Sequence, residues 1–165
     1  SLFMMRVGRV VTHELGRRRI GTSYSLTSGR YVRLDQINYY VPTCILDNEI
    51  ALGIFEEAFR AQEAAANTLA KLYDLNNTKD FALKKEVTSA IRRIIGNGQA
   101  ANIVVTGNHR SWRHMIELRT AMGAEEEIRL LFLKIAKWLS SRYVSIYEDM
   151  EILENGECRF EYGKV

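Results

Sequence analysis

The chain has 165 residues, 47% of them hydrophobic and 26% charged, with 23 Lys and Arg against 20 Asp and Glu. This length is typical of one domain with a buried core, and the composition excludes a disordered or collagen-like protein. No apolar run approaches the roughly 18 residues of a membrane span. The two cysteines, Cys44 and Cys158, lie far apart, which argues against a disulfide scaffold or a cysteine-rich zinc site. Together with the absence of a signal peptide, this favours a reducing, cytoplasmic location.

The N-terminal part of the chain predicts a helix, a loop and a strand. Apolar residues at helical spacing predict the helix from Phe3 to Leu15. The hydroxyl-rich stretch from Gly21 to Gly29 predicts a loop whose N–H and O–H groups can meet a ligand. β-Branched and aromatic residues predict an extended strand from Tyr31 to Val41, ended by Pro42.

Two helices and a short strand are predicted in the middle of the chain. Asp47 or Asn48 can cap a long helix that runs to about Asp74. A second helix is predicted from Lys79 to Ile95, with Gly96 at its end, and a strand from Gln99 to Thr106. The buried stripe expected on the long helix consists of Phe55, Ala58, Phe59, Ala65, Leu69 and Leu72.

The C-terminal part predicts two further helices and a hairpin. Asn108 is a good N-cap for a helix from His109 to Met122, and acids at 125–127 begin the next helix, where the helix dipole favours them. The residues expected to be buried on the helix that begins at these acids are Ile128, Leu131, Phe132, Ile135, Leu139 and Ile146. An Asn155-Gly156 turn between alternating segments predicts a β-hairpin. The sequence therefore predicts a single α+β domain over residues 1–165, rich in helices, with a small antiparallel sheet.

The first 33 residues are strongly basic, because they hold seven arginines, no lysine and one acid, Glu14. The planar guanidinium group binds phosphate or carboxylate through two hydrogen bonds. This segment therefore predicts an anion-binding region. A solvated basic arm or a nucleic-acid-binding patch is the alternative.

The predicted helix after Asn108 places an arginine among apolar residues. Trp112, Met115, Arg119 and Met122 share one face. A guanidinium on such a face needs an anion, either an acidic side chain or a ligand. Asn108, Arg110 and His114 form a polar edge near the positive end of this helix, a suitable place for a phosphate or an electron-rich ring.

The residues considered alone lead no further than an anion-binding domain. Arg92 lies near the end of its predicted helix, where a basic residue also suits the helix dipole. The sequence has no Gly-x-Gly-x-x-Gly, Walker loop or His-x-x-x-His motif, so it predicts neither P-loop chemistry nor a metal site. What remains is a domain with arginine-rich sites for a multiply anionic ligand.

Two segments resemble the flavin-dependent thymidylate synthases (ThyX). That family's hallmark is Arg-His-Arg, a seven-residue spacer and Ser-x-Arg; here Arg17-Arg18-Arg19 precedes Ser28-Gly29-Arg30. The second signature, Thr-Gly-Asn-x-Arg leading into a helix with an arginine, is matched by residues 106–110 and Arg119. Between the two motifs, Arg92 stands where the family places a further arginine.

The resemblance implies reductive methylation of dUMP at C5 by a homotetramer whose active sites combine residues of several subunits, with no nucleic-acid or membrane partner. NADPH would reduce FAD, and methylenetetrahydrofolate would donate the carbon. It implies that Arg119 contacts the pyrimidine and stabilises its negative charge as the catalytic residue. It also implies FAD binding by Arg17, Arg18, Arg19, Asn108, Arg110 and His114, and nucleotide binding by Ser28, Gly29, Arg30 and Arg92.

Several positions depart from the family pattern. Arg18 replaces the central histidine, the spacer has eight residues, and Leu26, Gly96 and Gly123 replace an acid or amide, a proline and a histidine. The family's upstream portion is expected to be absent, because the first motif lies near residue 1. These departures favour two alternatives: a UMP C5-methylase of a modified-nucleoside pathway, or a non-catalytic homologue that binds anions or nucleic acid.

Overall fold

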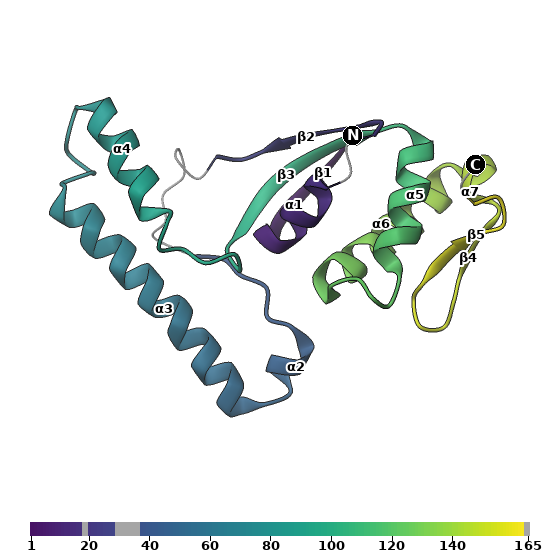
Figure 1. The fold of residues 1–165 in the computed structure, drawn as a ribbon, viewed down its shortest axis with the longest axis horizontal. Helices are drawn as coiled ribbons and strands as arrows, with labels where there is room; N and C mark the ends of the chain where they lie inside the picture. Colours follow the sequence, from purple (N-terminus) through teal and green to yellow (C-terminus); the bar gives the residue numbers. More distant parts are fainter. Residues whose placement is uncertain (18–19, 29–36, 164–165) are drawn as a thin grey trace. The chain divides into compact units, whose positions relative to one another are not determined.

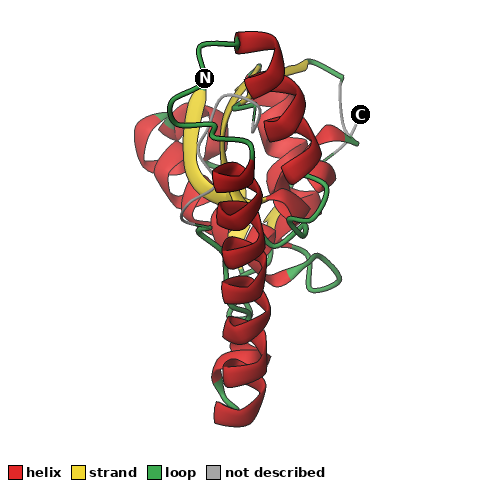
Figure 2. Ribbon diagram, turned by 90° about the vertical axis from the view of Figure 1, so that its left-hand side faces the viewer, coloured by secondary structure: helices red, strands yellow, loops and turns green. Residues whose placement is uncertain are grey.

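The computed structural model describes residues 1–17, 20–28 and 37–163. Its elements are numbered in chain order in Figure 1. Helices predominate among them, as the red ribbon of Figure 2 shows. The strands form a three-stranded sheet in the order β1-β3-β2 and a separate β4-β5 pair. The predicted class, α+β with many helices and a small antiparallel sheet, is confirmed.

The chain divides into two compact units. Unit 1 comprises residues 1–4, 11–25 and 104–165, and unit 2 comprises residues 5–10 and 26–103. Three elements have two or more residues in each unit: strand β1 (Leu2–Gly8), helix α1 (Arg9–Gly16) and strand β3 (Ala100–Gly107). Strand β2 (Thr22–Leu26) belongs to unit 1 except for its last residue.

Unit 1 is built around helices α5 (His109–Thr120) and α6 (Glu126–Arg142). Asn108 and Glu125 cap them by accepting hydrogen bonds from Ser111 N at 2.9 Å and Ile128 N at 3.2 Å. The two helices pack together through fully or nearly fully buried side chains, among them Trp112, Met115, Ile116, Ile128, Phe132, Ala136 and Leu139. This packing holds one face of α5 against α6.

The C-terminal part of unit 1 consists of the short helix α7 (Val144–Tyr147) and the antiparallel strands β4 (Met150–Ile152) and β5 (Cys158–Phe160). In this hairpin Met150 pairs with Phe160 and Ile152 pairs with Cys158. Gly156 adopts φ = 86° in the turn, a left-handed conformation that glycine takes without strain. The predicted hairpin is confirmed, and Cys158 and Phe160 bury their side chains.

Unit 2 contains helices α2 (Thr43–Leu46), α3 (Glu49–Leu72) and α4 (Phe81–Ile91). Asn48 and Asp80 cap α3 and α4 through their side-chain oxygens. The core between the two helices consists of Ala66, Val87 and Ile91, with Leu69, Ala70, Leu75, Leu83 and Ile95 packed against it. Nearer the middle of α3, the ring of Tyr39 stacks on Phe59 with centroids 3.9 Å apart.

Two predictions for the N-terminal region are wrong. Residues 2–8 form strand β1 instead of the first half of a helix, because they pair with β3, and Arg6, at φ = 53°, donates its backbone N–H to Asn102 Oδ1 at 2.9 Å. The predicted loop at 21–29 contains strand β2. Here Thr22 and Tyr24 are half-buried and alternate with exposed Ser23 and Ser25, the period of a strand.

The predicted strand at 31–41 falls largely on residues 29–36, which lie outside the described residues; within the described part, Tyr39 forms an isolated bridge with Gln99. Helix α4, predicted to run to Ile95, ends at Ile91, because Arg93 N and Ile94 N donate to the carbonyls three residues back and tighten the chain into turns. Leu72 and Ile146, both expected to be buried, are exposed.

The other predicted helices and the predicted strand are confirmed. Asn48 rather than Asp47 caps α3, while β3, α5 and α6 begin within one residue of the expected positions. On α3, however, only Phe59 of the expected stripe is fully buried, and Ala66 is buried in place of Ala65. None of the helices that the structure describes has both the length and the apolar character to cross a bilayer.

Candidate functional site

Arg119 lies in the last turn of α5 and is buried in unit 1, with 8% of its surface exposed. Its Nη1 donates to Glu14 Oε2 at 2.7 Å, and its Nη2 donates to the backbone oxygen of Glu14. The sequence left two possible partners for Arg119, an acidic side chain or a ligand. In this structure the partner is an acidic side chain, that of Glu14. The guanidinium is held between the inner face of α5 and helix α1.

Glu14 contacts a second arginine through its other oxygen. Arg17 Nη1 lies 2.7 Å from Glu14 Oε1, and the Arg17 side chain is 71% exposed. One carboxylate thus joins a buried arginine on α5 to an exposed arginine at the end of α1. The resemblance assigned these two arginines to different ligands, the pyrimidine and FAD.

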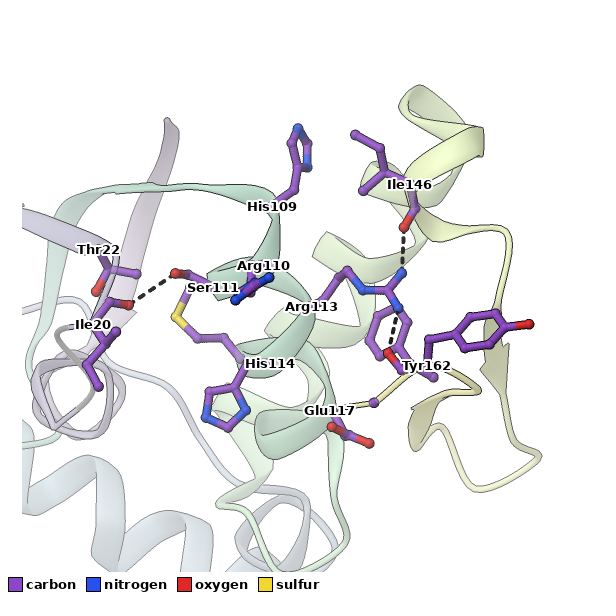
Figure 3. A pocket seen from close by; sticks show the side chains of 13 residues that line it. Ile20, Thr22, His109, Arg110, Ser111, Arg113, His114, Glu117, Ile146 and Tyr162 are labelled. Carbon is purple, nitrogen blue, oxygen red and sulfur yellow. Dashed lines mark hydrogen bonds between the residues drawn. The ribbon is translucent and has the colours of Figure 1, made fainter. Parts of the chain in front are cut away.

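The N-terminus of α5 is closely packed against the chain around Gly21. Gly21 adopts φ = 68°, and a Cβ atom there would lie 2.3 Å from Ser111 Oγ and 2.8 Å from Asn108 Nδ2. Ser111 Oγ donates to the Ile20 carbonyl at 3.0 Å (Figure 3). Residue 21 must therefore be glycine for both conformational and steric reasons. The contact fixes the segment before β2 to the start of α5.

A cavity of about 470 Å³ extends along the outer side of α5 in unit 1. Ile20 and Thr22 line one end, and Ile146 and Tyr162 line the other (Figure 3). Arg110 and His114, which the sequence assigned to a polar edge, both line this cavity, and Asn108 caps the helix beside them. The structure therefore brings together three of the predicted cofactor-binding residues.

Arg113 holds the C-terminal hairpin to α5. Its two Nη atoms donate to Asp149 Oδ1 and Oδ2 at 2.6 Å each, and further hydrogen bonds reach the carbonyl oxygens of Ile146 and Tyr162. The guanidinium also lies 4.1 Å from the centroid of the Phe160 ring. The hydrogen bond from Arg113 lowers the pKa of Asp149 to about 2, and the same bond raises the pKa of Arg113.

His109 links the start of α5 to α7. Its Nδ1 lies 3.1 Å from the hydroxyl of Tyr147, and its ring meets Tyr143 edge-on, with centroids 4.7 Å apart. Burial raises the pKa of Tyr147 to about 12, so its hydroxyl stays protonated at neutral pH. His109 also lines the cavity, so these contacts hold one part of the cavity wall in place.

Two arginines of unit 2 lie close enough to repel each other. Burial lowers the pKa of Arg9, and the charge of neighbouring Arg92 lowers it further. Arg9 Nε donates to Gln99 Oε1 at 3.3 Å, and its backbone N–H donates to the Gln99 carbonyl at 2.9 Å. Two cations held side by side favour the binding of an anion.

The remaining predicted residues lie in the first motif. Ser28 is half-buried and follows β2. Arg18, Arg19, Gly29 and Arg30 lie outside the described residues.

The sequence reasoning missed Glu14, Arg9 and the Arg113–Asp149 pair. Glu14 had a visible signal, since it is the one acid among the first 33 residues. Arg9 had only its place in the arginine cluster. The pairing of Arg113 with Asp149 had no signal, because 36 residues separate the two in the chain.

Comparison with known proteins identifies the family. The family model described as thymidylate synthase complementing protein matches residues 2–143. The flavin-dependent thymidylate synthase of Mycolicibacterium vanbaalenii is 35% identical over 158 residues, covering 93% of this chain and 62% of that protein. The enzyme of Mycobacterium tuberculosis is 33% identical over 157 residues, with 92% and 62% covered. The chain thus spans about 62% of the length of these curated relatives.

Solved structures share the fold. ThyX from Helicobacter pylori, crystallised with FAD and dUMP, superimposes with a TM-score of 0.58 at 20% identity, covering 89% of this chain and 70% of that one. The UMP/dUMP methylase PolB from Streptomyces cacaoi, bound with 5-Br dUMP, gives a TM-score of 0.62 at 18% identity, with 87% and 68% covered. On the family match over residues 2–143, the chain belongs to the thymidylate synthase complementing protein family.

Proposed function

We propose that this protein is an FAD-dependent enzyme that methylates C5 of a uridine monophosphate, converting dUMP to dTMP. Methylenetetrahydrofolate is the proposed carbon donor and NADPH the proposed reductant. The observation that supports this most strongly is the family match, which includes both arginine motifs. The curated relatives at 33–35% identity are flavin-dependent thymidylate synthases.

The residues around α5 fit a flavin. The cavity of about 470 Å³ has mainly apolar walls, as a planar ring requires, and Arg110 and His114 supply polar contacts at its edge. Gly21 keeps the backbone before β2 close to Asn108 and the helix N-terminus, which suits a phosphate. Arg17, Arg18 and Arg19 are the proposed partners of the flavin pyrophosphate. Bound FAD, once reduced, supplies the hydride that completes the methyl group.

A pair of cations in unit 2 fits the nucleotide phosphate. Arg9 and Arg92 lie beside each other, so a phosphate dianion would relieve their mutual repulsion. Ser28, Gly29 and Arg30 are the proposed additional contacts. These residues bind and orient the nucleotide, and they take no part in proton transfer.

Arg119 is the proposed catalytic residue. It is buried, so its charge acts in a region of low dielectric, where it stabilises an anion more strongly than in water. We propose that Arg119 donates hydrogen bonds to the pyrimidine and stabilises the negative charge that develops as C5 becomes nucleophilic. No cysteine nucleophile is required, and Cys158 is buried with a pKa raised by its burial.

UMP is the alternative substrate, and two positions favour it. A side chain at Gly123 would meet nothing within 4 Å among the described residues, and Leu26 is 41% exposed. Gly123 replaces a histidine of the family pattern and leaves room for a ribose 2′-hydroxyl, whereas Leu26 replaces an acid or amide and changes the polarity at its own position. The fold is shared with a protein described as a UMP/dUMP methylase, at a TM-score of 0.62.

We propose a homotetramer whose active sites combine residues of several subunits. Helix α3 supports this, because Ile50, Ile54 and Leu72 are exposed on it. We expect Ile54→Lys to reduce the mass measured by light scattering from four subunits to fewer. An unchanged mass would exclude this face of α3 from the interface.

The test of the function is spectroscopic and enzymatic. The purified protein is expected to be yellow, to release FAD on denaturation, and to release tritium from C5-labelled dUMP or UMP. Arg119→Ala is expected to lower turnover about 10³-fold, in the range seen when a charge-stabilising group is removed. Arg60→Ala is the matched control, because Arg60 forms an exposed ion pair with Glu56.

Three outcomes would contradict parts of this proposal. Near-normal turnover of Arg119→Ala would remove its catalytic role. Turnover of UMP well above that of dUMP would establish the alternative substrate. A colourless protein whose nucleic-acid affinity falls steeply with salt would indicate a binding protein instead of an enzyme.

A further inference from the structure

Glu14 occupies a position that none of the proposed functions explains. Its carboxylate accepts from Arg119 at 2.7 Å through one oxygen and from Arg17 at 2.7 Å through the other. Its backbone oxygen accepts a second hydrogen bond from Arg119. Three of its atoms therefore contact the two arginines.

The two contacts of Glu14 differ in strength because the arginines differ in exposure. The side chain of Arg17 is 71% exposed, so its ion pair with Glu14 is screened by water and contributes little. The side chain of Arg119 is 10% exposed, and that of Glu14 is 23% exposed. Removing an acidic partner from a largely buried cation leaves a charge without compensation. The main effect of Glu14 is therefore on Arg119.

Glu14 uses only part of the hydrogen-bonding capacity of Arg119. A guanidinium has five N–H donors, of which Glu14 accepts two, one from each Nη atom. Bonds at both Nη atoms restrict rotation of the planar group. The group is therefore oriented before a ligand arrives, which reduces the entropy lost on binding.

We propose that Glu14 is a positioning residue that fixes the orientation of Arg119 for the pyrimidine ring. This rests on the proposed function, in which Arg119 contacts that ring. Substitution of residue 14 removes the carboxylate but keeps the backbone carbonyl, so part of the restraint survives. Glu14 acts on nucleotide affinity through Arg119, and its contact with Arg17 is secondary.

The experiment is a double-mutant cycle on nucleotide binding, measured by isothermal titration calorimetry with dUMP and with UMP on the full chain. Glu14→Ala is expected to weaken binding of the preferred nucleotide about tenfold, equal to about 1.4 kcal/mol. Glu14→Gln keeps one acceptor oxygen and is expected to recover part of that loss. In the Arg119→Ala background, Glu14→Ala is expected to change affinity less than about twofold, because Glu14 then has no Arg119 to orient.

Two controls separate positioning from general damage. Glu56→Gln removes the same charge from an exposed ion pair in α3 and is expected to leave nucleotide affinity unchanged. FAD affinity of Glu14→Ala is expected to stay within about threefold of wild type, since the Arg17 contact is exposed. If Glu14→Ala unfolds, the nucleotide affinities of Glu14→Gln and wild type are compared instead, and they decide whether Glu14 positions Arg119.

The outcomes distinguish this inference from the proposed function. Wild-type affinity in Glu14→Ala or, where that variant unfolds, in Glu14→Gln overturns the positioning role and leaves the proposed function intact. An equal loss in the wild-type and Arg119→Ala backgrounds also overturns it, because Glu14 would then act independently of Arg119. Failure of the wild-type protein to bind either nucleotide contradicts the proposed function itself.

Discussion

The helical cores of the two units differ in how completely they bury their apolar residues. Helix α6 of unit 1 has 17 residues and buries five of them, Ile128, Phe132, Ile135, Ala136 and Leu139. Helix α3 of unit 2 has 24 residues and buries two, Phe59 and Ala66, while Ile50, Ile54 and Leu72 remain exposed. Within one chain, the core of unit 1 is largely complete, whereas α3 has an apolar surface that a partner could cover.

The arginines of the two units also differ in their charged neighbours. In unit 1, Arg113 and Arg119 are held by the carboxylates of Asp149 and Glu14. In unit 2, Arg9 and Arg92 lie near each other, and the pKa of Arg9 is lowered. In unit 1 a carboxylate therefore restricts the position of each of these arginines, including the proposed catalytic Arg119, whereas in unit 2 the two arginines are close enough for their charges to interact.

The largest expected difference in stability concerns buried and exposed apolar residues. Phe132→Ala removes a fully buried ring from α6 and is expected to cost about 4 kcal/mol, because the cavity cannot collapse completely. Phe81→Ala truncates a side chain that is 65% exposed on α4, outside the proposed interface, and is expected to change stability by less than about 0.5 kcal/mol. Urea unfolding measures both. A large loss for Phe81→Ala would show that another subunit covers α4.

The next effect concerns the Arg113–Asp149 pair. Asp149→Asn replaces the bidentate ion pair between the Asp149 carboxylate and the Arg113 guanidinium with neutral contacts. It is expected to lower the free energy of unfolding by about 2 kcal/mol at neutral pH. The pKa of Asp149 is lowered from 3.8 to about 2, so the folded state favours the ionised carboxylate. This stabilisation is complete above about pH 4 and is lost as pH falls through about 2. Thermal unfolding of wild type and variant should therefore converge at low pH; a constant difference would contradict the assignment.

A smaller effect compares the same capping residue in both units. Asn108 accepts from Ser111 N at 2.9 Å, and Asn48 accepts from Ile50 N and Ala51 N at 3.1 Å each. Replacing either asparagine with alanine is expected to cost about 1 kcal/mol, measured by urea unfolding. FAD titration separates them, because only Asn108→Ala is expected to weaken flavin binding. Equal flavin affinity in both variants would remove Asn108 from the cofactor site.

The smallest effect concerns an exposed ion pair. Glu56 and Arg60 lie four residues apart on α3 with their charged atoms 3.3 Å apart. Glu56→Gln is expected to change stability by less than about 0.5 kcal/mol, because water screens the pair. Thermal unfolding at low and high salt checks this. A larger loss that salt abolishes would indicate a wider charge network on α3.

Local signals in the sequence were sufficient for most helices and for the hairpin. The asparagines before α3 and α5 and the Asn155-Gly156 turn each act through neighbouring backbone groups, so a short window of sequence contains the cause. Strand β1 was missed because its pairing partner, β3, lies about 100 residues away, and that pairing outweighs the helical spacing of Val7 and Val10. Strand β2 was missed because most of its alternating buried and exposed side chains carry hydroxyl groups, so the sequence shows no alternation of apolar and polar residues.

The candidate site shows the same limit. The motif resemblance and the helical spacing both selected Arg119, and the cavity contains Arg110 and His114 as the predicted polar edge. The partner of Arg119 could not be predicted, because Glu14 is 105 residues away and its helix was expected to begin earlier. The assignments to Arg18, Arg19, Gly29 and Arg30 stay predictions.

The contacts of Arg113 have a practical consequence for anyone shortening the gene. The family match ends at residue 143, so an expression clone designed from it would end there. Yet the groups that accept from Arg113, at residues 146, 149 and 162, all follow that boundary. A protein cut at 143 would lack α7 and the β4-β5 hairpin of unit 1 and would leave the largely buried guanidinium of Arg113 without these acceptors. An expression clone should therefore retain the last twenty or so residues, although the family match stops before them.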